Sequence, residues 1–99
     1  MKESDIKYLT HEYRVISEME DTIEKIKKDK ANFVRSLENR FRRKGSMKEA
    51  QQRLKDHLER NPNGEEAKRL KQLENRLRHV IRTLEAKKQY VEEKKQSFE

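Results

Sequence analysis

The stretch "RNPNGEE", residues 60–66, contains the only proline of the 99-residue chain and one of its two glycines. Pro62 suits the second position of a tight turn, and Asn63 and Gly64 suit the later positions. Asn63 is followed three residues later by Glu66, which is the spacing of an N-terminal helix cap. The stretch therefore predicts that one helix ends, the chain turns and another helix begins, as in an αα-hairpin.

A second break is predicted at Gly45-Ser46, after the basic run "RFRRK" at residues 40–44. Basic side chains in a last turn complement the helix dipole, and a glycine just past the end accepts a left-handed conformation. Ser46 and Glu49 then have the spacing of a capping box. The sequence leaves open whether the chain reverses here or only kinks. Together the breaks predict helices over about 4–44, about 47–60 and about 65–98.

The apolar residues between the breaks recur every three or four positions. In the first segment they are Ile6, Leu9, Tyr13, Ile16, Met19, Ile23, Ile26, Phe33, Val34, Leu37 and Phe41. In the last segment they are Leu70, Leu73, Leu77, Val80, Leu84, Val91 and Phe98, with Lys87 and Lys94 where the stripe is interrupted. One narrow apolar stripe per helix is typical of a coiled coil, and no segment has the period of two that a strand requires. We therefore expect an all-α fold, an elongated antiparallel helical hairpin or coiled coil with a long N-terminal helix, forming one domain over residues 1–99.

Composition favours the same fold class. Only 30% of the residues are apolar and 45% are charged, whereas a globular domain is usually nearer half apolar and a quarter charged. Such a chain has too little apolar material for a compact layered core, so its helices are expected to share narrow seams. Acidic residues four positions before basic ones, as in Glu38–Arg42 and Glu74–Arg78, each stabilise a helix by roughly 0.2–0.5 kcal/mol.

Folding the chain at the turn after residue 61 sets a register for the hairpin. The facing apolar pairs are then Leu54 with Leu70, Met47 with Leu77, Phe41 with Leu84, Val34 with Val91, and Ile26 with Phe98. That register leaves the stripe at the start of the first helix without a partner in the chain, and an unpartnered apolar stripe usually marks an interface. We therefore expect this stripe to form a homodimer or to pack against a partner protein. Its residues are Ile6, Leu9, Tyr13, Ile16, Met19, Ile23 and Ile26.

One short motif occurs twice, as "LENRFR" at residues 37–42 and "LENRLR" at residues 73–78. The repeat fits a duplicated helix. It also fits two unrelated helices that each place leucine in a seam and charged residues beside it.

The net charge of +7 is unevenly distributed along the chain. Residues 1–24 carry −4, residues 25–60 carry +8 and residues 61–99 carry +3. Clustered Lys and Arg neutralise phosphates, so the basic clusters support an alternative function in nucleic-acid or other polyanion binding. In the expected register the two clusters form one basic band. Its residues are Arg40, Arg42, Arg43, Lys44, Lys48, Arg76, Arg78 and Arg82.

Other chemistries find little support in the sequence. The chain has no cysteine and no Gly-rich phosphate loop, and His11, His57 and His79 do not occur in a metal-ligand spacing. We therefore expect no enzymatic activity, no catalytic residue, no cofactor, no metal site and no small-molecule substrate. No apolar run is long enough to span a membrane, and the N-terminus does not have the pattern of a signal peptide. We expect no membrane partner and a cytoplasmic location, in a cell or in an infected host.

These observations favour a non-catalytic helical interaction protein that acts as a homo-oligomer through coiled-coil seams. Adaptor, scaffold, inhibitor and assembly factor all fit this description. The alternative is a nucleic-acid-binding protein that uses the basic band.

Overall fold

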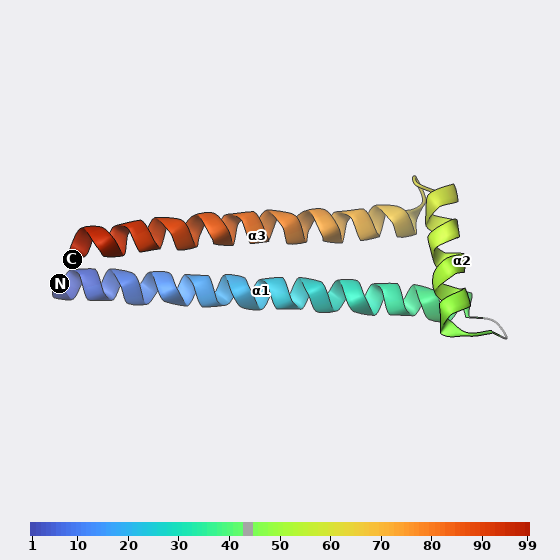
Figure 1. Cartoon of the computed structure of the whole chain (residues 1–99), viewed down its shortest axis with the longest axis horizontal. Coiled ribbons are helices and arrows are strands. Elements are labelled where there is room, and N and C mark those ends of the chain that lie inside the picture. Colours follow the sequence, from blue (N-terminus) through green and yellow to red (C-terminus); the bar gives the residue numbers. More distant parts are fainter. Residues whose placement is uncertain (43–44) are drawn as a thin grey trace. The chain divides into compact units, whose positions relative to one another are not determined.

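The computed structural model describes residues 1–42 and 45–99, and within them it contains three helices and no strand (Figure 1). Helix α1 spans Glu3–Phe41, α2 spans Met47–Arg60 and α3 spans Glu65–Phe98. The expected all-α helical hairpin is confirmed, as are both breaks. None of the described helices is both long enough and apolar enough to cross a membrane.

Helix α2 begins where the capping box predicts. Ser46 has an extended backbone, with φ of −76° and ψ of 160°, and its hydroxyl accepts a hydrogen bond from the Glu49 amide. This bond satisfies one of the amides that the first turn of a helix leaves unpaired. Gly45 differs from expectation, because no described glycine has a positive φ. The break therefore depends on the Ser46 cap and not on a left-handed glycine.

The turn between α2 and α3 closes through backbone hydrogen bonds. The Asn61 amide donates to the carbonyl of His57, and the Gly64 amide donates to the carbonyl of Asn61, each at 3.0 Å. Lys68 donates its amide to the Gly64 carbonyl at 3.0 Å, so Gly64, and not Asn63, occupies the N-cap position of α3.

The chain forms two compact units. The terminal unit contains residues 1–25 and 77–99, and the central unit contains residues 26–76. The terminal unit is therefore built from the first part of α1 and the last part of α3. The central unit holds the rest of both helices and all of α2.

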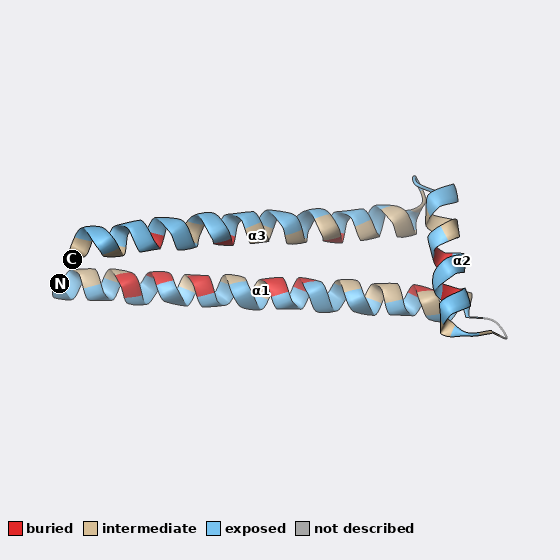
Figure 2. Ribbon diagram, viewed as in Figure 1, coloured by how far each residue is buried: buried red, intermediate tan, exposed pale blue. Residues whose placement is uncertain are grey.

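In the terminal unit, α1 and α3 lie side by side and antiparallel, with both chain termini at the same end (Figure 1). Their shared seam buries Leu9, Ile16 and Ile23 of α1 against Leu84 and Val91 of α3 (Figure 2). Fully burying one such side chain stabilises the folded state by roughly 1.5–3 kcal/mol. At the end of the seam, the rings of Tyr8 and Phe98 meet edge to face, with centroids 5.9 Å apart.

The expected hairpin register is wrong. Phe98 contacts Tyr8 and not Ile26, and the core places Leu84 and Val91 with the start of α1. The error arises because the expected register counts residues 47–60 as part of an arm, whereas the Ser46 cap starts them as a separate helix. Residues 47–60 therefore belong to neither arm. The stripe at the start of α1 consequently has a partner within its own chain.

In the central unit, α2 runs crosswise to the end of α1 and the start of α3 (Figure 1). The buried apolar residues of this unit come from all three helices, and they are Ile26, Leu37, Ala50, Leu54 and Leu73. Leu37 and Leu73 are the first residues of the two LENR motifs. Both motifs therefore place their leucine in the core, while the arginines Arg40 and Arg76 are exposed.

Candidate functional site

The expected self-association stripe is divided by the fold. Leu9, Ile16, Ile23 and Ile26 are buried within the chain, and Met19 packs partly buried against the terminal seam. The other two members remain available on the surface: Ile6 is 53% exposed and Tyr13 is 46% exposed.

The terminal seam also contains an ion pair that the sequence analysis did not predict. The Glu12 carboxylate is buried and faces the ammonium of Lys87 across the two helices. The hydrogen bond with Glu12 is the main cause that raises the pKa of Lys87, against the opposing effect of burial. Burial, followed by the charge of Glu12, raises the pKa of the neighbouring Tyr8. The pair thus lies in a small polar cluster inside an otherwise apolar seam.

The two units differ in charge. The central unit contains sixteen Lys and Arg against eight Asp and Glu, for a net charge of +8. The terminal unit contains ten against eleven, for a net charge of −1. The whole positive excess of the protein therefore lies in residues 26–76.

The expected basic band is divided between the units. Arg40, Arg42, Lys48 and Arg76 are exposed residues of the central unit. Arg78 and Arg82 are exposed too, but they belong to the terminal unit. Arg43 and Lys44 lie outside the described residues. The register that joined all eight residues into one band is not the observed one.

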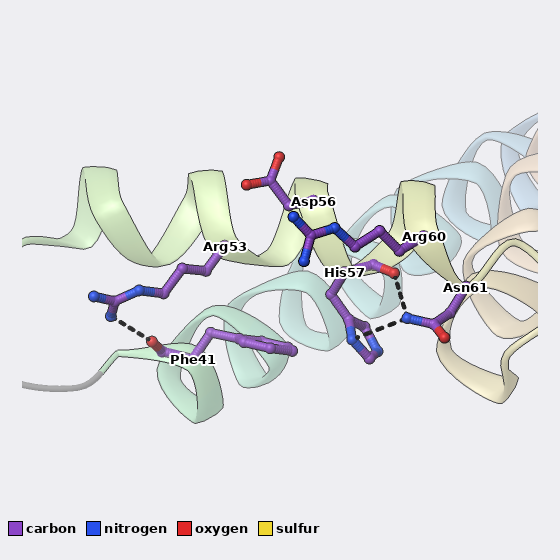
Figure 3. Close-up of a pocket in the computed structure, with 6 residues that line it drawn as sticks. All are labelled: Phe41, Arg53, Asp56, His57, Arg60 and Asn61. Carbon is purple, nitrogen blue, oxygen red and sulfur yellow. Dashed lines mark hydrogen bonds between the residues drawn. The ribbon is translucent and has the colours of Figure 1, made fainter.

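A hollow of about 410 Å³ lies in the central unit where α2 meets the end of α1 (Figure 3). Four of its six lining residues come from α2, one ends α1 and one follows α2. They are Phe41, Arg53, Asp56, His57, Arg60 and Asn61. The hollow thus combines an aromatic ring with two guanidinium groups.

The aromatic floor of the hollow is held in place by Asn61. The ring centroids of Phe41 and His57 are 5.0 Å apart, with a tilt of 47° between the planes. The side-chain amide of Asn61 donates to the His57 carbonyl at 2.9 Å and lies 3.4 Å from the His57 Nδ1 (Figure 3). If Nδ1 accepts this contact, the ring carries its proton on Nε2. The end of α2 therefore fixes the imidazole against Phe41.

Glu66 connects three helices on the other side of His57. Its Oε1 lies 3.5 Å from Nη1 of Arg40, at the end of α1. Its Oε2 lies 3.9 Å from the Nε2 of His57, on α2. Because Glu66 stands in the first turn of α3, one carboxylate contacts all three elements of the central unit. A further pair of Lys30 and Glu74, at 3.4 Å, joins α1 to α3.

The two arginines of the hollow are held differently. Arg53 Nη1 donates to the Phe41 carbonyl at 3.3 Å, satisfying a carbonyl that the end of α1 leaves unpaired. Its Nη2 lies 3.9 Å from Glu49. Arg60 is exposed, and its side chain forms no hydrogen bond or ion pair within the described part of the chain. Asp56, the acidic group of the lining, accepts a hydrogen bond from Gln52 at 3.0 Å.

Sequence reasoning missed His57, Asn61 and Glu66 as a connected group, because it weighed His57 only as a metal ligand. Within residues 1–42 and 45–99, no three His, Asp or Glu side chains are grouped so that they could hold a metal ion. No family model, curated protein or solved structure matches this chain. The arrangement of charges and the hollow therefore provide the basis for a functional proposal.

Proposed function

We propose that this chain is a non-catalytic helical interaction protein, and that its central unit binds a polyanionic partner, nucleic acid. The observation that carries the proposal is the charge difference between the units, +8 in the central unit against −1 in the terminal unit. Clustered cations release the counterions condensed on nucleic acid, which supplies much of the binding free energy.

The arrangement of the arginines supports the same proposal. Arg42 directly follows α1 and Arg76 lies on α3, and both are exposed in the central unit. Neither forms an ion pair within the described residues. Their guanidinium groups are free to bind phosphate oxygens, which Arg recognises with two parallel hydrogen bonds. The terminal unit, in contrast, is nearly neutral at −1 and offers no comparable excess of cations.

A mobility-shift experiment tests this proposal. Random duplex and single-stranded nucleic acid should be retarded at low salt, and the affinity should fall steeply as salt is added. Arg42→Glu with Arg76→Glu should abolish most of the binding. Arg14→Glu with Lys88→Glu is the matched control, because it makes the same charge change at exposed sites of the terminal unit. Absence of retardation at low salt, or an equal loss in both double variants, would refute the proposal.

A second candidate function is self-association through the exposed part of the N-terminal stripe. Ile6 and Tyr13 are seven residues apart on α1, so they lie on the same side of the helix two turns apart. Their exposed fractions of 53% and 46% are high for large apolar side chains. We propose that these two residues contact a second copy of the chain.

Light scattering tests the self-association. Ile6→Glu with Tyr13→Glu should reduce the measured mass from that of a dimer to that of a monomer. Lys7→Glu with Arg14→Glu is the control, because it places two glutamates at the adjacent exposed positions with the same spacing. A wild-type protein that is monomeric at high concentration, or a mass unchanged by the first double variant, would exclude this interface.

A further inference from the structure

We propose that the hollow lined by Phe41, His57, Arg53 and Arg60 binds one nucleotide unit of a single-stranded nucleic acid. In this arrangement the base stacks on the aromatic floor and the flanking phosphates lie against the two arginines. The inference rests on the proposed nucleic-acid binding of the central unit and specifies the kind of strand.

The helix period brings the polar groups of the hollow to one face. Arg53, His57 and Arg60 occupy positions i, i+4 and i+7 of α2, which share a face of an α-helix. Seven residues correspond to roughly 10.5 Å along the helix axis at 1.5 Å per residue. The two arginines thus originate two turns apart on α2, with His57 between them in the sequence, and Figure 3 shows the Arg60 side chain extending back along α2 in the direction of Arg53.

The two arginine side chains of the hollow differ in how firmly they are held. Arg53 is anchored by its bond to the Phe41 carbonyl, so one of its edges is fixed while its side chain remains 45% exposed. Arg60 forms no ion pair or hydrogen bond within the part of the chain that the structure describes, so its donors are available to a ligand. An anionic group in the hollow would meet one positioned and one adjustable guanidinium.

The floor of the hollow indicates what accompanies the anion. Phe41 is half-buried and tilted by 47° against His57, so the two rings form an angled aromatic surface at the base of the hollow. Nucleobases stack on such surfaces without regard to sequence, because every base has an aromatic face. The volume of about 410 Å³ lies within the roughly 300–1,000 Å³ of ordinary ligand pockets.

These features favour a single strand over a duplex. In a duplex the bases are stacked on their neighbours and their faces are not accessible to a protein ring. In a single strand the bases can turn outward onto aromatic side chains while the backbone follows a positive groove. Asp56 also lines the hollow, and Figure 3 shows its carboxylate pointing away from the Phe41 ring, so phosphates are expected on the Phe41 side of α2.

Anisotropy titration of labelled oligothymidylate, oligouridylate and a mixed-sequence duplex tests the proposal on the full chain. The single strands should bind more tightly than the duplex. Phe41→Leu keeps an apolar side chain and the charge but removes the ring, and should weaken single-strand binding about five- to tenfold while leaving duplex binding unchanged. Arg60→Gln should weaken single-strand binding about tenfold. Arg14→Gln, the charge-matched control in the terminal unit, should have a much smaller effect.

Proton NMR of the three histidines provides a second measurement that needs no variant. Oligothymidylate should shift the imidazole resonances of His57 in the hollow and leave those of His11, in the terminal unit, in place. This measurement keeps the proposal testable if circular dichroism shows that Phe41→Leu loses helix.

The outcomes separate the two proposals. If the wild type binds neither strand form at low salt, the proposed function fails and this inference fails with it. If the duplex binds as tightly as the single strands, or Phe41→Leu binds like the wild type, the hollow is not a base site although the central unit binds nucleic acid. Inorganic polyphosphate that competes as well as oligothymidylate of equal charge would likewise remove the stacking role of Phe41.

Discussion

The terminal and central units both bury apolar helix faces, but they differ in the number of helices and in the polar contacts between them. In the terminal unit, two helices close on an apolar seam interrupted by one buried ion pair, Glu12 with Lys87. In the central unit, three helices meet, and Glu66 contacts Arg40 of α1 and His57 of α2. The terminal unit is nearly neutral, whereas the central unit carries +8.

The difference shows where a chain of this composition can place function. In the terminal unit the apolar rows of two helices form a seam, and a hollow of about 540 Å³ at its end is lined by Met1, Lys2, Asp5, Ser97 and Phe98, with no arginine among them. In the central unit the crosswise helix α2 meets the end of α1, and this junction brings together aromatic and cationic side chains of both helices (Figure 3). The crossing of α2, which makes the expected register wrong, therefore also forms the hollow.

The largest expected effect concerns the terminal seam. Ile16 is 7% exposed and Ile6 is 53% exposed, although both belong to the stripe that the sequence marks as an interface. Ile16→Ala should lower the free energy of unfolding by about 2–4 kcal/mol, because it opens a cavity in the core. Ile6→Ala should lower it by less than about 1 kcal/mol. Urea unfolding followed by circular dichroism measures both.

Ile16→Ala and Ile6→Ala also distinguish packing within one chain from packing between two copies. If Ile16 lies in the chain's own core, the stability loss of Ile16→Ala is independent of protein concentration. A loss that grows on dilution, or equal losses for the two isoleucines, would place the stripe between copies and contradict the observed packing.

The next largest effect concerns the ion pair of the terminal seam. Lys87→Met removes the cation and leaves the Glu12 carboxylate buried without a partner, so the variant should be clearly less stable than the wild type. Lys88→Met, at the exposed neighbouring position, should have little effect. Adding Glu12→Gln to Lys87→Met should restore part of the loss. No restoration in this thermal-denaturation cycle would show that the two groups do not act as a pair.

A smaller effect is expected at the junction of the central unit. Glu66→Gln removes the charge that contacts Arg40 and His57, and both contacts are partly exposed to solvent. Partly exposed ion pairs contribute little, so the loss should be about 0.5–1 kcal/mol. Glu65→Gln, the exposed neighbour in the same first turn, is the control for the helix-dipole contribution. Similar losses in the two variants would assign no special role to the junction.

The two breaks between the helices could be predicted because local chemistry determines them, although α1 ends at Phe41 and not near the expected residue 44. Ser46 with Glu49, and Pro62 with Gly64, act within a few residues, so their consequences do not depend on tertiary structure. The register could not be predicted in the same way. The middle segment has apolar residues at helical spacing whether it continues an arm or crosses it, and no local signal at Gly45 distinguishes the two.

The ion pair of the terminal unit could have been predicted from the spacing of its two residues in the sequence. Glu12 lies three residues after Leu9 and four before Ile16, and Lys87 has the same position between Leu84 and Val91. Opposite charges at equivalent seam positions predict that the helices pair there. His57 and Glu66 left no such signal, because their contact depends on the direction in which α2 crosses the arms.

The smallest expected effect is the response of the terminal unit to alkaline pH. The pKa of Tyr8 is raised above its ordinary value of 10.0, chiefly by burial, so folding favours the neutral phenol. The pKa of Lys87 is raised above its ordinary value of 10.5, chiefly by its hydrogen bond with Glu12, so folding favours the ammonium. Both contributions to stability are complete below the ordinary pKa values and are lost as pH rises through the raised ones.

Denaturation at pH 8 and at pH values between 10 and 12 measures this loss. The wild type should lose stability across the alkaline range, and the double variant Tyr8→Phe with Lys87→Met should lose less, because it lacks both titrating groups. Tyr13→Phe with Lys88→Met removes the same residue types from exposed positions and should follow the wild type. If the first double variant declines as steeply as the second, the alkaline loss comes from the general repulsion of the remaining charges and the cluster around Glu12 contributes nothing to it.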